Sequence, residues 1–278
     1  MLPELAAALR CPHCGGALRL DDRTARCPAG HAFDLAKQGY LNLLPSGSTG
    51  IEGDTAAMVA ARSDFLAAGA YLPIRDALTA ATTTDGLVVE VGAGTAYYLA
   101  GVVDASPGRS GLALDVSRYA ARRAAKAHPR IGAVVCDAWR ELPLQDGAAQ
   151  VLLNVFAPRN ADEMARVLTP GGTLLVVTPN PRHLAELVGV LGLVRVDDSK
   201  ERRLAETLAG RFTRVGDQTV DHLMSLDHKA IGDLVRMGPS AWHTDPAVLT
   251  TRIAELLDAT EVTLSVTLST WHPAPGSR

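Results

Sequence analysis

Length, composition and charge describe an ordinary globular chain and exclude several classes of protein. The 278 residues are 47% hydrophobic with a mean hydropathy of +0.10, which suffices for one large domain and a small one. No apolar run approaches the ~20 residues of a membrane span, and no secretory signal pattern opens the chain, so we expect a cytoplasmic protein without a membrane partner. The net charge of −3 gives no global indication of a nucleic-acid partner.

A metal-binding pattern lies close to the N-terminus. Cys11 and Cys14 form a C-x2-C pair, and Cys27 and His31 form a C-x3-H pair. Three thiolates and one imidazole complete the tetrahedral shell of a structural Zn²⁺ ion and leave no open position for catalysis. Unconnected free thiols are the alternative, but they would not require two matched pairs. Cys136 stands apart, at the end of an apolar run, and is expected to be a buried small residue.

The segment Leu87–Tyr98 predicts a strand, a tight turn and a helix. A β-branched run ends at Glu90 and breaks at Gly92 and Gly94 before a helix-forming stretch. The glycines would let the backbone approach a ligand, and the free N–H groups of the helix would point toward it. The third glycine of a dinucleotide-binding fingerprint is absent, and Ala96 stands where we expect a methyl group to fit between strand and helix.

Two acids follow the next predicted strands. Asp115 ends the strand at 111–115, and Asp137 follows the strand at 131–136. Together with Glu90, they resemble the S-adenosylmethionine (SAM) site of Rossmann-like methyltransferases. In that family the first acid lies near the methionine end of SAM, the second binds the ribose hydroxyls, and the third holds the adenine amino group. The alternative is the same fold without the ligand, because a G-x-G turn alone is a weak signal.

Strands and helices alternate after the glycine turn, which predicts a mostly parallel sheet with ligands at the carboxyl ends of its strands. The predicted strands lie near 87–91, 111–115, 131–136, 150–155 and 173–178. The region 192–258 is expected to be mostly helical, with a further strand at 215–223. The alternating segment Glu261–Thr270 predicts a final antiparallel strand, which fits the seven-stranded α/β Rossmann-like methyltransferase fold.

Helix signals and turn residues divide the chain into three parts. Asp54 is expected to cap a helix that runs through Ala68 and stops at Gly69, and Ser117 is expected to cap the helix after the second strand. A Gly/Ser/Thr stretch after Pro45 predicts a flexible linker. The parts are a zinc-binding substrate-recognition domain (1–45), linker and helices (46–84), and a SAM-dependent methyltransferase domain (85–278).

A zinc set in front of a SAM fold resembles the bacterial 23S rRNA (guanine-N1) methyltransferases, over nearly the whole chain. The resemblance is carried by several runs: Cys11-Pro-His-Cys14, Gln38-Gly-Tyr-Leu-Asn-Leu-Leu44, Phe65-Leu66 to Gly69, and Asn154-Val-Phe-Ala-Pro-Arg-Asn160. The last run is similar to the branch of the family that confers resistance to tylosin-type macrolides. The resemblance implies an enzyme that methylates N1 of a guanine in a hairpin loop of 23S rRNA.

The resemblance also implies roles for individual residues. Tyr71, His183 and the turn Gly94-Thr95 would contact SAM, while Asn154 and Pro158 would shape the pocket for the target base. Each has a structural alternative. Tyr71 could pack in the core, His183 could begin a helix, and a buried amide such as Asn154 needs partners wherever it lies.

The charge pattern keeps a second substrate class open. Nothing basic lies between Lys37 and Arg62, and residues 1–45 carry five basic and four acidic side chains, a net charge of +1. Because RNA affinity depends on phosphate neutralisation, a SAM-dependent methyltransferase of a small nitrogen heterocycle is the alternative. A third class is a zinc-bearing RNA-binding or regulatory protein that binds SAM without transferring its methyl group. The sequence identifies no general base and leaves the oligomeric state open, a homodimer included.

Overall fold

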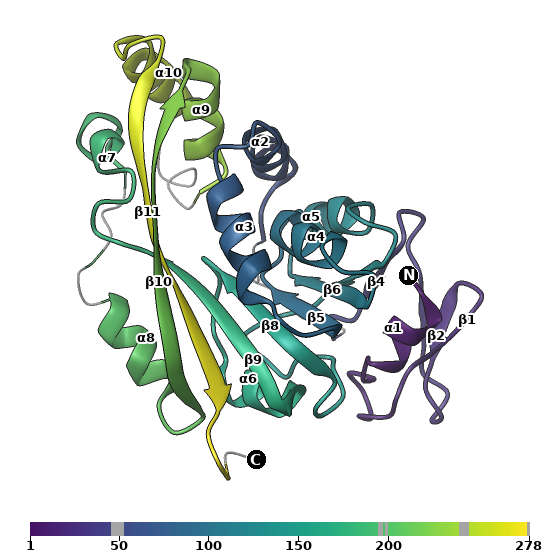
Figure 1. Cartoon of the computed structure of the whole chain (residues 1–278). Helices are drawn as coiled ribbons and strands as arrows, with labels where there is room; N and C mark the ends of the chain where they lie inside the picture. Colours follow the sequence, from purple (N-terminus) through teal and green to yellow (C-terminus); the bar gives the residue numbers. More distant parts are fainter. Residues whose placement is uncertain (46–52, 194–196, 198–199, 239–244, 277–278) are drawn as a thin grey trace.

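The structure, a computed structural model, describes residues 1–45, 53–193, 197, 200–238 and 245–276 (Figure 1). Most of the linker predicted after Pro45 falls outside these ranges. Among the helices within them, none is long and apolar enough to cross a membrane. The chain forms a small N-terminal region beside one large sheet that carries helices on both faces.

The N-terminal region is a short helix followed by a three-stranded antiparallel sheet. α1 (Pro3–Ala7) begins with proline, whose missing N–H costs no hydrogen bond in a first turn. β1 (Arg19–Asp21), β2 (Thr24–Arg26) and β3 (Ala32–Asp34) pair in chain order. Asp22 turns the first hairpin with a φ of 51°, in the left-handed region that aspartate tolerates better than most residues.

The large sheet has eight strands in the order β10-β11-β9-β8-β5-β6-β7-β4. Its parallel centre coincides with the five predicted strands. These are β5 (Gly86–Val91), β6 (Arg109–Asp115), β7 (Ile131–Val135), β8 (Ala149–Val155) and β9 (Leu168–Pro179). Helices cover both faces, so these strands are continuous apolar runs rather than alternating ones.

Both edges of the large sheet differ from its centre. β11 (Thr260–Pro273) pairs antiparallel with β9, which confirms the predicted final strand. β10 (Phe212–Leu226) pairs antiparallel with β11, and Figure 1 shows the two as long neighbouring strands. β10 is longer than the strand predicted at 215–223 within a mostly helical region. At the opposite edge β4 (Tyr40–Asn42) lies parallel to β7, adds an eighth strand to the expected seven, and joins the N-terminal region to the sheet.

Two layers of helices enclose the sheet (Figure 1). One face is covered by α2 (Ala56–Ala67), α3 (Leu72–Ala81), α4 (Tyr97–Asp104), α5 (Arg118–Ala124), α7 (Ala185–Leu191), α9 (His228–Arg236) and α10 (Pro246–Ala254). The opposite face is covered by α1, α6 (Ala161–Val167) and α8 (Lys200–Leu208). The carboxyl ends of the parallel strands lie between these layers and remain accessible to a ligand.

The helix ends confirm one predicted cap and correct another. Ser117 caps α5, because its hydroxyl accepts the N–H of Ala120 at 3.3 Å. The prediction that Asp54 caps α2 is wrong, since the cap is Thr55, whose hydroxyl accepts a backbone N–H of the first turn. The carboxylate of Asp54 instead forms an ion pair with Arg62 at 2.6 Å.

Candidate cofactor pocket and zinc centre

The four predicted zinc ligands meet at one point in the N-terminal region. The ligand atoms of Cys11, Cys14, Cys27 and His31 all lie within 4.8 Å of one another. The Sγ atoms of Cys14 and Cys27 are 3.6 Å apart, and Nδ1 of His31 lies 3.3 Å from Sγ of Cys27. A tetrahedron with Zn–S bonds of about 2.3 Å and a Zn–N bond of about 2.0 Å has edges of about 3.5–3.8 Å. The set therefore fits a structural zinc ion bound through Nδ1 of His31.

Two tight turns hold these ligands in place. Gly15 follows the first pair with a φ of 71°, and Gly30 lies within the second with a φ of 86°, a region in which other residues are disfavoured. The N–H of Gly15 donates to the carbonyl of Cys11, and that of Gly30 donates to the carbonyl of Cys27. His13, between the first two ligands, stays exposed and stacks on a phenylalanine ring rather than joining the set.

A pocket of about 280 Å³ opens at the carboxyl ends of the central strands. Five predicted site residues line it, and they come from the loops after four neighbouring strands: Gly92 and Gly94 after β5, Asp115 at the end of β6, Asp137 after β7 and Pro158 after β8. Ligands of open parallel sheets bind at this position. The pocket is therefore the candidate site for SAM.

The turn after β5 needs its glycines for close packing. Gly92 has a φ of 71°, and a Cβ there would lie 2.5 Å from the Cβ of Ala157. Gly94 has a φ of 53°, and a Cβ there would lie 3.2 Å from Cδ of Arg62. Ala96 is fully buried, as expected for a methyl group between strand and helix, but its φ of 59° places it in the left-handed region that favours glycine.

Asp115 holds the glycine turn with both of its carboxylate oxygens. Oδ2 accepts the N–H of Gly94 at 2.7 Å, and Oδ1 accepts the N–H of Ser117 at 2.8 Å. Burial raises the pKa of Asp115, and the two backbone N–H groups oppose that rise. Each oxygen keeps a further lone pair, so the carboxylate can still accept hydrogen bonds from two ribose hydroxyls.

Glu90 lies beneath the turn rather than in the lining of the pocket. Its side chain is buried, and Oε2 accepts the N–H of Leu99 in the first turn of α4 at 3.2 Å. Burial raises the pKa of Glu90 to about 8, with a smaller contribution from the charge of Asp115. A largely protonated Glu90 therefore positions the start of α4, whose N–H groups face the pocket.

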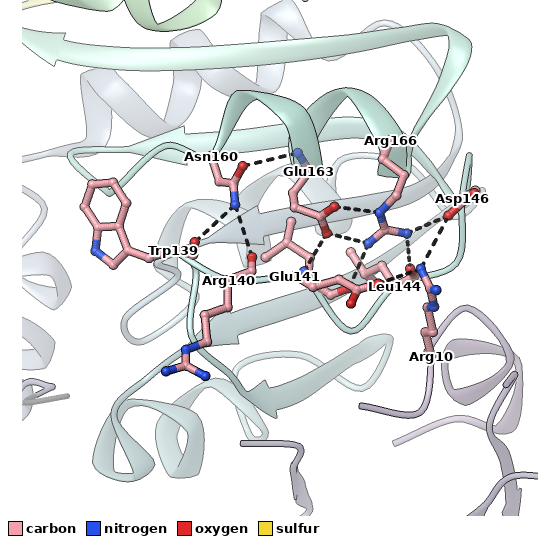
Figure 2. A network of polar contacts seen from close by, with 10 residues as sticks. Arg10, Trp139, Arg140, Glu141, Leu144, Asp146, Asn160, Glu163 and Arg166 are labelled. Carbon is pink, nitrogen blue, oxygen red and sulfur yellow. Dashed lines mark hydrogen bonds and ion pairs between the residues drawn. The ribbon is translucent and has the colours of Figure 1, made fainter. Parts of the chain in front are cut away.

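The loop after β7 presents Asp137 and is held by a polar network. The N–H of Trp139 donates to Oδ1 of Asp137 at 2.9 Å, and Nε of Arg140 lies 3.3 Å from Oδ2. Figure 2 shows Asn160 donating to the carbonyls of both Trp139 and Arg140. Arg166 of α6 ties the same loop to that helix, because its guanidinium donates to the loop carbonyls of Leu142 and Leu144 at 2.9 and 2.7 Å. Its ion pair with Glu163 of the same helix, at 2.6 Å, holds the guanidinium in place.

This network also reaches the N-terminal region. Arg10 forms an ion pair with Glu141 at 2.7 Å and lies 3.9 Å from Asp146, which also pairs with Arg166 (Figure 2). The N-terminal region, which holds the four zinc ligands, therefore contacts the loop that carries Asp137. Trp139 follows Asp137 on this loop, is 67% exposed and lines the pocket.

The turn after β8 brings Asn154 and Pro158 together. Asn154 is fully buried, and its Nδ2 donates to the carbonyl of Pro158 at 2.8 Å. Its Oδ1 is buried and accepts no hydrogen bond from a described residue, which is uncommon for a buried polar atom. Asn154 itself does not belong to the described lining of the pocket, whereas the three residues after Val155 do. Between them Phe156 adopts a φ of 54° and exposes its ring to the pocket.

Tyr71 and His183 form a buried pair behind Phe156. The hydroxyl of Tyr71 lies 3.3 Å from Nε2 of His183, and Nδ1 of His183 accepts the N–H of Ser265 at 3.3 Å. Burial and the charge of Lys200 lower the pKa of His183 to about 4, so the imidazole is neutral at physiological pH. Its ring stacks on Phe156 with centroids 6.0 Å apart. Neither Tyr71 nor His183 belongs to the described lining of the pocket.

Thr95 likewise does not line the pocket, although both of its neighbours belong to the glycine turn. The sequence analysis did not assign four charged or aromatic lining residues to the site, namely Asp54, Arg62, Trp139 and Phe156. A signal existed for Arg62, which lies four residues from both Met58 and Leu66 on the buried face of α2. A charge on the apolar face of a helix is unusual unless it has a partner or a ligand.

Fold and pocket together define a SAM-dependent methyltransferase with a structural zinc centre. The family model described as "RlmA, N-terminal" matches residues 9–48, and the one described as "Methyltransferase domain" matches residues 89–176. A chain in the solved complex between the Haloferax volcanii Trm112 methyltransferase activator and a methyltransferase shares the fold. Its TM-score is 0.53 at 16% identity, and the match covers 81% of this chain and 100% of that one.

Curated relatives define the family more narrowly. The 23S rRNA (guanine(748)-N(1))-methyltransferase of Streptomyces fradiae is 52% identical over 281 residues, which cover 99% of this chain and 100% of the relative. A Micromonospora griseorubida protein named for the same guanine-N1 reaction is 52% identical over 295 residues, which cover 98% of this chain and all of the relative. The chain therefore belongs to the family of 23S rRNA (guanine-N1) methyltransferases, as the sequence resemblance indicated.

Proposed function

We propose that this enzyme transfers the methyl group of SAM to N1 of the guanine of 23S rRNA that corresponds to position 748. The observation that carries this proposal is the 52% identity to the Streptomyces fradiae enzyme over 99% of the chain. Family membership favours this substrate over the small nitrogen heterocycle. Since the substrate is ribosomal RNA, we place the enzyme in the cytoplasm. A homodimer is an expectation that light scattering of the purified chain tests.

The chemistry is an in-line displacement in which N1 of guanine bonds to the methyl carbon as the S–CH3 bond of SAM breaks. S-adenosylhomocysteine is the leaving group, and the N1 proton passes to water. The protein's task is to hold the acceptor nitrogen against that methyl group, because positioning supplies much of the rate. Asn154 shapes the pocket for the target base from behind, because its buried side chain holds the turn that carries Phe156 and Pro158. The exposed ring of Phe156 offers a stacking surface for a base extruded from a hairpin loop. Pro158 fixes the carbonyl that orients Asn154.

The cofactor roles follow the positions of the predicted residues. We propose that Asp115 binds the ribose hydroxyls, Asp137 binds the adenine amino group, and the Gly92–Gly94 turn lies against the methionine end. Glu90 supports that turn from beneath by accepting the N–H of Leu99, and Thr95 forms part of the turn itself. Tyr71 and His183 act through Phe156, which stacks on His183 and faces the pocket.

The N-terminal region would bind the RNA hairpin. Arg10 already pairs with Glu141, and Arg23 donates to two backbone carbonyls. The remaining basic side chains of residues 1–45 are exposed and form no ion pair with another described residue; they are Arg19, Arg26 and Lys37. Phosphate contacts by these three would position the hairpin. The functional division that we propose is recognition by 1–45, connection by 46–84, and catalysis by 85–278.

Primer extension on a 23S rRNA hairpin tests the proposal. Methylation of N1 blocks base pairing, so reverse transcriptase should stop one nucleotide before the guanine after incubation with enzyme and SAM. Asn154→Ala should weaken the stop while leaving SAM binding largely intact. Gln218→Ala is the control, because Gln218 is an exposed amide on the edge strand β10 and lies outside both the pocket lining and residues 1–45. Read-through with fully SAM-loaded wild-type enzyme would contradict the RNA substrate.

A further inference from the structure

We propose that Arg62 binds the carboxylate of the methionine part of SAM. Arg62 lies on α2, lines the pocket, and packs beside Gly94 in the turn after β5. The inference rests on the assignment of this pocket to SAM and does not depend on the RNA substrate. SAM carries a sulfonium, an ammonium and a carboxylate at its methionine end, so a site for it must match both signs of charge.

The charges of the pocket leave Arg62 as the partner for a carboxylate. Arg62 is the only lysine or arginine among the described lining residues, whereas Asp54, Asp115 and Asp137 contribute carboxylates. These acids suit hydroxyl, amino and ammonium groups. A ligand carboxylate would be repelled by all three unless a cation faced it in the same partly buried space. Charge complementarity therefore places the carboxylate of SAM at Arg62.

The hydrogen bonds of the guanidinium point to the same conclusion. Nη2 donates to Oδ2 of Asp54 at 2.6 Å and to the carbonyl of Met237 at 2.8 Å, which uses both of its hydrogens. Nε is buried and has no partner among the described residues. A buried, charged donor is costly to leave unpaired, so this N–H is available for a ligand.

The position of that free donor is set by its neighbours. Cδ, which is bonded to Nε, lies 3.2 Å from where a Cβ of Gly94 would be, so the guanidinium borders the glycine turn. Asp54 cannot swing away freely, because its backbone carbonyl accepts the hydroxyl of Ser117 at 2.6 Å. Asp54 is thus a positioning residue that keeps the guanidinium plane over the pocket, and this explains why its carboxylate does not cap α2.

Calorimetry with two ligands tests the inference. S-adenosylhomocysteine carries the carboxylate, and S-adenosyl-3-thiopropylamine is the same molecule without it. Wild-type enzyme should prefer the first by about 10- to 150-fold, the range of a hydrogen bond to a charged group. Arg62→Gln should bind both ligands within about twofold of each other. Arg122→Gln, which removes an exposed arginine of α5 that stacks on Tyr119, should keep the wild-type preference.

The outcomes separate the inference from the cofactor assignment. An unchanged preference in Arg62→Gln would overturn the role of Arg62. Absence of S-adenosylhomocysteine binding to the wild-type enzyme would instead contradict the SAM site itself. If Arg62→Gln does not fold, Arg62→Lys replaces it, since lysine keeps the charge but lacks Nε. Its preference should fall at least threefold, by about 0.7 kcal/mol, and an unchanged preference would again overturn the inference.

Discussion

Asp115→Asn is expected to remove most of the affinity for SAM although it barely changes the size of the side chain. In the structure each carboxylate oxygen of Asp115 accepts one backbone N–H, from Gly94 and from Ser117. Asparagine has one acceptor oxygen and one amino group, so one of those N–H groups would face another donor. The substitution thus disturbs the glycine turn and also removes the carboxylate that we propose as the partner of the ribose hydroxyls.

Two losses set the size of this effect. Charge-assisted hydrogen bonds to the ribose are worth about 1.5–3 kcal/mol, which corresponds to about a 10- to 150-fold higher Kd for SAM. The unpaired backbone N–H should lower the free energy of unfolding by about 1–3 kcal/mol. Calorimetry measures the first quantity and denaturant unfolding the second. Asp104→Asn, at an 81% exposed side chain on the end of α4, is the matched control. Wild-type affinity in Asp115→Asn would refute the ribose role.

Three further predictions follow from the zinc centre, the buried acid and the basic surface. Cys14→Ser should release the metal, so metal analysis should fall from one zinc per chain to well below half; a full equivalent in the variant would contradict the ligand set. Glu90 has a folded pKa of about 8 against an ordinary 4.5, so its contribution to stability is complete below pH 4.5 and is lost as pH rises through 8. Glu90→Gln should therefore flatten the fall in unfolding free energy between pH 5.5 and 8, and an unchanged slope would refute the burial of a protonated carboxyl. Replacing Arg19, Arg26 and Lys37 by glutamine should reduce the log–log salt slope of hairpin binding by about 2–3 if each contacts a phosphate, whereas an unchanged slope would place the RNA elsewhere.

The sequence predicted the parts of the fold that depend on local pattern. The five central strands, the final antiparallel strand and the cap at Ser117 all follow from periodicity or from a single side chain near its partner. The zinc ligands could be predicted for the same reason, because two short spacings fix four donors. β4 could not, since its three residues become a strand only by pairing with β7, far along the chain.

The pocket shows where local pattern stops being informative. Glycines and acids at strand ends predicted Gly92, Gly94, Asp115 and Asp137 as neighbours, and all four line one pocket. Asp54 has the side chain of a good helix cap, but its ion pair with Arg62 lies two helical turns away and outcompetes that role. Deleting residues 1–45 would also remove β4 and the apolar contacts of α1 from the large sheet, so charge substitutions test RNA binding more cleanly than truncation.

The most direct test of the central claim is methyl transfer from labelled SAM. Purified enzyme is offered a 23S rRNA hairpin that contains the guanine at position 748 and, in parallel, a low-molecular-weight cell extract. We predict labelled hairpin at both low and moderate salt, loss of label when that guanine is replaced by adenine, and no labelled metabolite. A labelled metabolite together with an unlabelled hairpin would contradict the assignment and favour the small heterocycle.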